Sequence, residues 1–238
     1  MKHLISFISV FMMLSFMAKA QDSPMNEEQR LEVSVETPIG IDYEPASELL
    51  QSNIQQALIL NGLSSTTGRF TTITKVVAIS KDVTATAPAM IVTNLNITLL
   101  IGDLYTGTLF GQCEFEVKGI GETDSKSYMD AIRKVKARNP KLRSMIVKSK
   151  EKILSYFDAN REQILNRIDA HITRKDYKSA LIEIYSIPKA SAELYNEAGE
   201  RLSKIPAETI SSTQINSSIL DEYHFNGTRA ERALIFNK

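Results

Sequence analysis

Apolar and polar residues alternate along several stretches of the first half of the chain. The segment LEVSVE at 31–36 shows the period-two pattern of a half-buried strand. β-Branched residues dominate 69–80, where the alternation slips once, as a β-bulge would cause. Alternation returns at 91–101 and 109–117, on either side of the turn residues at 102–108. The last two stretches predict an antiparallel hairpin.

Helical spacing interrupts these strands twice. Apolar side chains repeat at helical spacing over 45–60 and stop at Asn61-Gly62, a common helix end. A second helix follows the last strand, with Thr123 or Ser125 as its N-cap. The order β-α-β-β-β-α predicts an α+β domain at 31–137. Its sheet should be antiparallel or mixed, with both helices on one face.

The second half of the chain changes to a period of 3.6 residues. Seven of the ten glycines lie between Gly62 and Gly121, and glycine weakens helices. We therefore expect a helical domain at 141–205. Its first part is either one long helix or two helices that meet near 158–160. Residues 206–227 are rich in Ser, Thr and Asn, and 206–238 is predicted to form a mostly irregular tail, with a short helix around 229–236 as an alternative for its end.

The first twenty residues have the features of a secretory signal peptide. Lys2 and His3 precede an apolar run over 4–17, and Ala18-Lys19-Ala20 then forms a cleavage site. The run is shorter than the roughly 20 apolar residues that a membrane-spanning helix needs. Cleavage after Ala20 would leave 21–30 as a linker. No transmembrane segment and no cysteine for an acyl anchor are expected after that site.

Composition narrows the class of partner. The 28 basic and 28 acidic residues become 26 and 28 once Lys2 and Lys19 are removed, a net charge of −2. A near-neutral chain without a basic cluster argues against binding to nucleic acid. We expect other envelope proteins, or a second copy of the chain, as partners.

No group of residues has the pattern of a catalytic, metal or cofactor site. Cys113 is the only cysteine, and it shares the apolar side of its strand, which favours a buried hydrophobe over a reactive thiol. His171 and His224 are far apart and lack further ligands at metal-binding spacing. Gly119-Ile120-Gly121 matches half of a dinucleotide fingerprint, but position 124 is Asp, so a tight turn before a helix cap is favoured. We therefore predict no catalytic residue, no metal ligand, no cofactor and no enzymatic activity.

Two stretches resemble known families. The first is Ala57-Leu58 followed by Gly68-Arg69-Phe70 at a strand start. The second is LNITLLI at 95–101, followed by Asp103, Thr106-Gly107, Leu109, Gly119-Ile120-Gly121 and Ala131-Ile132. Together they resemble the periplasmic domain of the curli secretion channel lipoprotein, the N-terminal domain of the Tol translocation protein and the lipoprotein activators of peptidoglycan synthases.

This resemblance covers 31–137, about half of the mature chain. It implies an α+β envelope module without enzymatic activity that binds other proteins, sometimes as a ring. The chain differs from the channel family because it has no lipobox cysteine and no obvious membrane-spanning hairpins. Only the soluble domain is therefore carried over.

A third stretch resembles one unit of a repeat protein. Asp176-Tyr177, Ala180-Leu181 and Ile187-Pro188 are similar to the second helix of a tetratricopeptide repeat. That resemblance implies a peptide-binding groove. A plain helical bundle beside the sheet is an equal alternative.

We expect an exported bacterial envelope protein, periplasmic, outer-envelope associated or secreted, that acts as a protein-binding scaffold or as an accessory of assembly or secretion. The alternative is a small-ligand binder or an enzyme. Its site would lie where the 81–90 loop meets the 102–108 turn, with Asp103, Lys81 and Asp82 gathered in one pocket.

Overall fold

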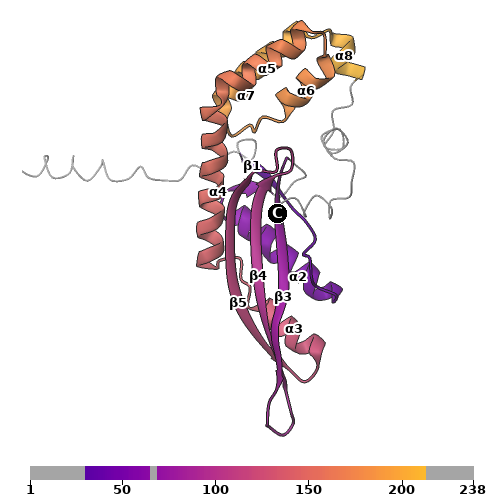
Figure 1. The fold of residues 1–238 in the computed structure, drawn as a ribbon, viewed down its shortest axis with the longest axis vertical. Helices are drawn as coiled ribbons and strands as arrows, with labels where there is room; N and C mark the ends of the chain where they lie inside the picture. The colour runs from indigo at the N-terminus through magenta and orange to yellow at the C-terminus, as the bar shows by residue number, and fades with distance from the viewer. Residues whose placement is uncertain (1–29, 65–68, 213–238) are drawn as a thin grey trace, which may run out of the picture.

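The computed structural model describes residues 30–64 and 69–212 (Figure 1). The strands in chain order are β1 (Leu31–Val35), β2 (Leu63–Ser64), β3 (Phe70–Val83), β4 (Ile91–Asp103) and β5 (Leu109–Gly121). The helices that pack on the sheet are α2 (Glu44–Leu60), α3 (Asp124–Arg133) and α4 (Pro140–Ala159). The chain continues with α5 (Arg161–Thr173), α6 (Tyr177–Tyr185), α7 (Ala192–Glu200), a 3₁₀ turn (Arg201–Lys204) and α8 (Ala207–Ser212).

The strands form one mixed sheet in the order β2-β1-β3-β4-β5. β1 is parallel to both β2 and β3, whereas β3, β4 and β5 are antiparallel neighbours. The predicted α+β class and the antiparallel hairpin at 91–117 are confirmed. The predicted bulge is present as a register shift between Ala78 and Ser80.

The strands are longer than the side-chain pattern predicted. β3 continues to Val83, so Lys81 and Asp82 belong to a strand and not to a loop. Pairing with β4 extends this strand although most of its last seven side chains are exposed, because backbone hydrogen bonds do not depend on a buried side chain. The connection between β3 and β4 is correspondingly shorter than the expected 81–90 loop.

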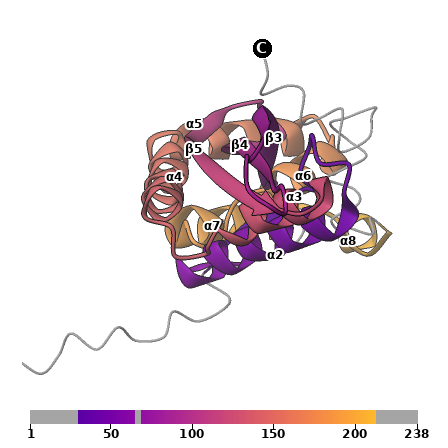
Figure 2. The ribbon, with the colours of Figure 1, turned by 90° about the horizontal axis from the view of Figure 1, so that it is seen from below.

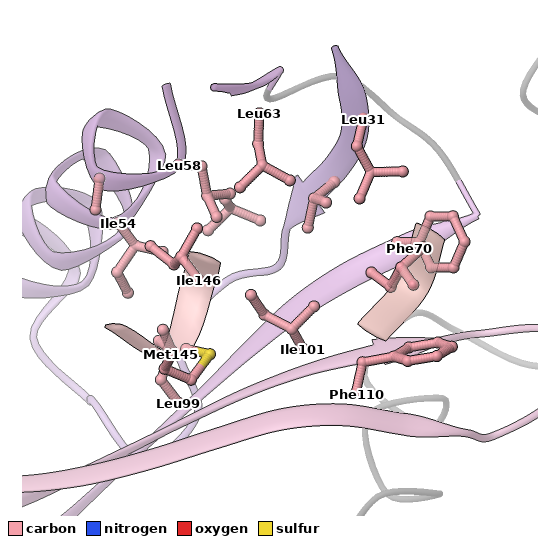
Figure 3. Close-up of a cluster of buried hydrophobic side chains, with 14 of the residues drawn as sticks. Leu31, Ile54, Leu58, Leu63, Phe70, Leu99, Ile101, Phe110, Met145 and Ile146 are labelled. Carbon is pink, nitrogen blue, oxygen red and sulfur yellow. The ribbon is translucent and has the colours of Figure 1, made fainter. Parts of the chain in front are cut away.

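Helices α2 and α3 lie on one face of the sheet, and α4 packs beside β5 (Figure 2). Apolar side chains from these helices meet the inward side chains of β3, β4 and β5 in a single buried cluster. Figure 3 shows part of it, with Ile54 and Leu58 of α2 and Met145 and Ile146 of α4. The expected packing of the predicted helices on one face is thus confirmed.

Three glycines of β5 let the helices approach this strand. A Cβ atom at Gly119 would lie 1.8 Å from the carbonyl oxygen of Ser127 in α3. A Cβ atom at Gly111 would lie 1.8 Å from Oγ of Ser149 in α4. The expectation of a tight turn at Gly119-Ile120-Gly121 is wrong, because β5 runs through Gly121 and the glycines provide room for α3 instead. Of the two predicted N-caps of α3, Thr123 and Ser125, it is Thr123 that caps the helix, accepting a hydrogen bond from the Lys126 N–H.

The second half of the chain is helical, as predicted. Of the two alternatives for its start, two helices are present, since α4 ends at Ala159 and α5 begins at Arg161. α5 and α6 form a helical hairpin whose turn contains Lys175 with a positive φ of 60°. The same buried cluster continues from the sheet into α5, α6 and α7. No helix of the described ranges is long and apolar enough to cross a membrane.

The expected tail at 206–238 begins with the short helix α8. Residues 213–238, which include His224, lie outside the described residues, as do the signal peptide and most of the linker at 21–30.

Candidate functional site

Residues of the two motifs that resemble the envelope families converge in a buried ion pair. Arg69 precedes β3 and Asp103 ends β4, and the register places Phe70 opposite Asp103. The Arg69 Nη2 and Nε groups donate to one oxygen of the Asp103 carboxylate, at 2.6 and 2.9 Å. The Asp103 side chain is 1% exposed and that of Arg69 is 12% exposed. The pair is thus almost completely removed from water.

Neighbouring groups complete the hydrogen bonds of the Asp103 carboxylate. The Tyr105 N–H donates to its other oxygen at 2.8 Å, and the Thr106 hydroxyl donates at 3.0 Å. Gly107, with φ of 68°, donates its N–H to the Asp103 carbonyl and closes the turn. The Asp and Thr-Gly elements of the motif therefore form a turn that holds a buried carboxylate.

Arg69 also connects the sheet to the helices. Its guanidinium carbon lies 5.0 Å from the centre of the Tyr105 ring and 5.1 Å from that of Phe157 in α4. Its Nη1 donates to the Ser186 hydroxyl at the end of α6, at 3.3 Å. Because one guanidinium contacts the β4–β5 turn, α4 and α6, this site joins the two halves of the molecule. The geometry of the Arg69–Asp103 pair indicates a structural role, which is to hold the sheet and the helices together.

The alternative site predicted from sequence does not come together. Lys81 lies opposite Thr93 in the β3–β4 ladder, ten positions from Asp103 on the same strand. At about 3.3 Å per residue, the separation is roughly 33 Å. Lys81 instead forms an ion pair with Asp124 at the start of α3, at 2.6 Å. The prediction of one pocket containing Asp103, Lys81 and Asp82 is therefore wrong, because most of the length of β4 lies between them.

A shallow pocket of about 530 Å³ lies beside α3. Tyr43, Met90, Ile120 and Met129 supply its apolar walls. Its carboxylates are paired within α3 or just before it. Lys126 hydrogen-bonds to Glu122 and lowers the pKa of that carboxyl.

The second carboxylate of this pocket, Asp130, holds the end of β5. The Ile120 N–H donates to it at 3.0 Å, and this bond is the main cause of its lowered pKa. Lys134 forms an ion pair with Asp130 at 2.9 Å and lowers the pKa further. Only Met90 comes from the loop that was expected to carry a site.

Cys113 lies on the helix-facing side of β5, where it packs partly buried against the core. Burial raises the pKa of its thiol to about 11, and the positive charge of Lys141 opposes this shift only in part. A thiol with such a pKa is protonated at neutral pH and is a poor nucleophile. These findings favour the predicted role as a small apolar residue.

His171 is more constrained than the sequence indicated. Its Nδ1 lies 3.0 Å from a carboxylate oxygen of Asp176, and its Nε2 lies 4.0 Å from Glu183. The His171 side chain is only partly exposed. Within 30–64 and 69–212, no three His, Cys, Asp or Glu residues form a group that could hold a metal ion.

On the sheet face opposite α2 and α3, Ile73 and Leu100 are buried against Ile39, and beyond them the face carries polar side chains that are exposed or partly exposed. The register aligns three polar rows there, Lys75-Thr98-Glu114, Val77-Asn96-Glu116 and Ser80-Asn94-Lys118. The Asn94 amide donates to the Ser80 hydroxyl at 2.7 Å, and the Asn96 amide donates to Glu114. The polar alternation of β4 and β5 is visible in the sequence, but the row of polar side chains across three strands follows only from the strand register.

Comparisons with known proteins place the chain only loosely. No family model and no curated protein matches it. A solved structure of a minor lipoprotein from Acinetobacter baumannii is 14% identical, with a TM-score of 0.29, and the match covers 55% of this chain and 94% of that one. A candidate lipoprotein from Caulobacter crescentus CB15 is 12% identical, with a TM-score of 0.26 and coverage of 53% and 86%. With TM-scores this low, the resemblance to the curli, Tol and peptidoglycan-synthase-activator families stays a prediction.

Proposed function

We propose that this chain is an exported bacterial envelope protein without enzymatic activity that binds other proteins through the open face of its sheet. The observation that carries the proposal is the polar part of the β3–β5 face, on which none of the described helices packs, since α2, α3 and α4 cover the other side of the sheet. Polar, partly exposed surfaces of this kind are typical of non-obligate protein interfaces. The signal-like first twenty residues support export.

The outer face offers contacts with both signs of charge. Glu114, Glu116 and Lys118 are exposed along β5, and Lys75 is exposed on β3. Mixed charges at the rim of an interface select partners and orient them more than they add affinity. A scaffold or an assembly accessory would use such a face.

The test is site-specific photocrosslinking in cells that export the full chain. A crosslinking residue at Glu116 should yield a defined adduct in envelope fractions, and the mature protein should begin at Gln21 by mass spectrometry. Glu116→Arg should weaken capture of the purified partner. Glu151→Arg, the same charge change on the exposed side of α4, should not. A monomer that forms no adduct from any exposed face would contradict the proposal.

The pocket beside α3 favours a small ligand as the second candidate function. Its volume of about 530 Å³ is within the range of ligand-binding pockets. Binding there would be detected as a ligand-dependent rise in Tm that Met129→Trp, which fills the pocket, abolishes. No such ligand from a metabolite library would leave protein binding as the function.

A further inference from the structure

The last seven residues of β3 are exposed on both faces of the sheet. Val77, Ile79 and Val83 are 50%, 51% and 69% exposed, and Ser80 is the only residue of Val77–Val83 that is partly covered. Val77, Ile79 and Val83 are β-branched and apolar, and such residues normally occur in strands that are covered. In Figure 1 the end of the β3–β4 hairpin extends beyond α3 at the foot of the molecule.

This part of β3 is also an open sheet edge. The Ile39 N–H donates to the Thr74 carbonyl at 2.8 Å, and the Val76 N–H donates to the Ile39 carbonyl at 2.9 Å. Pairing on that side ends at Val76. Beyond it, no residue of the described ranges is paired with the edge.

The register shows which backbone groups face outward. The hydrogen bonds to Ile39 show that the backbone N–H and C=O groups of the even-numbered residues Thr74 and Val76 point away from β4. The bulge between Ala78 and Ser80 adds one residue and so reverses this alternation. After it, the backbone groups of the even-numbered residues Ser80 and Asp82 bond to β4. The N–H and C=O groups of Lys81 and Val83 therefore project from the open edge.

At the opposite edge of the sheet, formed by β5, several backbone groups are bonded by side chains. On β5, the Ile120 N–H is bonded by Asp130 at 3.0 Å and the Lys118 carbonyl by Lys134 at 2.6 Å. The Glu114 carbonyl accepts from Lys141 at 3.4 Å. Capping of edge groups by charged side chains prevents unwanted strand pairing. Part of the β5 edge is covered in this way, whereas no side chain of the described residues bonds to the outward groups of β3 from Val77 to Val83.

We propose that the Val77–Val83 edge binds an extended segment of a partner protein, which adds as a further strand of the sheet. This inference rests on the proposed protein-binding function and adds to it a second contact, at the edge of the same sheet, together with the form of the partner that binds there. Strand addition gains its affinity from main-chain hydrogen bonds and its specificity from alternate side chains. The partner segment should be rich in β-branched apolar residues that cover Val77 and Ile79.

Charge defines the partner further. Asp124 neutralises Lys81 at 2.6 Å, whereas the described contact of the exposed Asp82 carboxylate is the Ser80 hydroxyl at 3.3 Å. The edge therefore presents a net negative charge. A basic residue of the added strand would lie opposite Asp82.

A second copy of the chain fits this edge poorly. Two-fold antiparallel pairing that uses the outward groups of both Lys81 and Val83 places Asp82 against Asp82, and like charges directly opposite are unfavourable. Seven residues are also far fewer than the roughly 20–30 residues on each side of a standard interface between folded proteins. A short extended segment has neither difficulty.

The test combines crosslinking with removal of one backbone donor. A photocrosslinking residue at Ile79 of the exported full-length protein should capture a partner peptide, located by mass spectrometry within a stretch of β-branched and basic residues. Lys81→Pro removes an outward N–H that β4 does not use, as edge strands tolerate. It should reduce the adduct about tenfold, as expected for one lost hydrogen bond together with the steric block.

Lys81→Val is the matched control. It loses the same ion pair with Asp124 but keeps the N–H, and it should capture the partner as well as the parent chain does. Asp82→Lys should reduce capture without changing Tm. If Lys81→Pro fails to fold, Val83→Pro against Val83→Thr gives the same comparison.

Three results would overturn the inference. They are an adduct that Lys81→Pro and Val83→Pro do not reduce, an adduct between two copies of this chain, or no adduct from Ile79. An adduct from Glu116 without one from Ile79 would reject strand addition and leave the proposed function standing.

Discussion

At the scale of single residues, glycine decides how closely the helices approach β5. Gly111, Gly119 and Gly121 lie where α4 or α3 passes over the strand, and a side chain at each would collide with helix atoms. Sequence reasoning found these glycines and assigned the pair at 119 and 121 to a turn. The error is understandable because a glycine that makes room for a neighbour and a glycine that makes a turn look the same in sequence.

Gly119→Ala should lower the free energy of unfolding by about 3 kcal/mol, the upper range for overpacking a tight contact. The new Cβ would lie 1.8 Å from the Ser127 carbonyl oxygen and 2.8 Å from the Ala131 Cβ. Gly199→Ala is the control, because nothing lies within 4 Å of its Cβ position in α7. It should stabilise by about 0.5–1 kcal/mol through helix propensity. Urea unfolding measures both, and equal effects would contradict the packing explanation.

The Cys113 thiol should titrate far above a free thiol. Burial raises the pKa of this thiol to about 11, whereas the pKa of a cysteine in the unfolded chain is about 8.5. Between these values the unfolded chain has lost the proton that the folded chain keeps. The stability that this group contributes is therefore fully present below pH about 8.5 and is lost as pH rises toward 11.

Two measurements check this titration. The rate of alkylation of the folded protein by iodoacetamide should keep rising above pH 9.5, and the stability difference between the parent chain and Cys113→Val should change in the same range. A reaction midpoint near 8.5 in the folded protein would show that the thiol is exposed.

At the scale of elements, a buried ion pair fastens the end of one strand to the start of another. Arg69 and Asp103 lie 34 positions apart, and neither is surrounded by a local pattern that indicates pairing. The family resemblance marked both residues without assigning them a contact. Only the β3–β4 register places Phe70 opposite Asp103. Because Arg69 precedes Phe70, the same register brings the Arg69 guanidinium to the Asp103 carboxylate.

Arg69→Met should destabilise the protein by about 3–5 kcal/mol, because it leaves the Asp103 carboxylate buried without its counter-charge. Arg69→Met combined with Asp103→Asn should recover a large part of that loss, since the amide still accepts from the Tyr105 N–H and carries no charge. Chemical unfolding of the single and double variants gives the coupling energy. Additive losses would show that the two side chains do not act as a pair.

At the scale of the whole molecule, the sheet and the helices share one hydrophobic core. The sequence predicted a domain boundary between 137 and 141, where the spacing of apolar residues changes from mixed strand and helix periods to a helical period. α4 begins there, yet Leu142, Met145 and Ile146 are buried with β-strand residues such as Leu99 and Ile101. A change of periodicity marks a change of secondary structure and does not mark the end of a core.

A chain that ends at residue 139 should therefore fail to fold cooperatively, although it contains the whole predicted α+β domain. It would expose the core residues that α4 covers and should bind the dye ANS. A chain that ends at residue 160 keeps α4 and should show a cooperative thermal transition. If the shorter chain melted cooperatively within a few degrees of the longer one, the sheet and α4 would be separate units.

The sequence by itself determined the α+β class, the order of the helices and of every strand except the two-residue β2, the bulge in β3, and two candidate caps for α3. These features depend on alternation, helical spacing and turn residues, which are local in the chain. Only the tertiary structure decided that Arg69 meets Asp103, that Lys81 and Asp103 lie at opposite ends of the sheet, and that no described strand pairs with the end of β3. The physical reason is that strand register and the path of each helix are set by contacts between residues distant in sequence, and a local pattern contains no information about its partner.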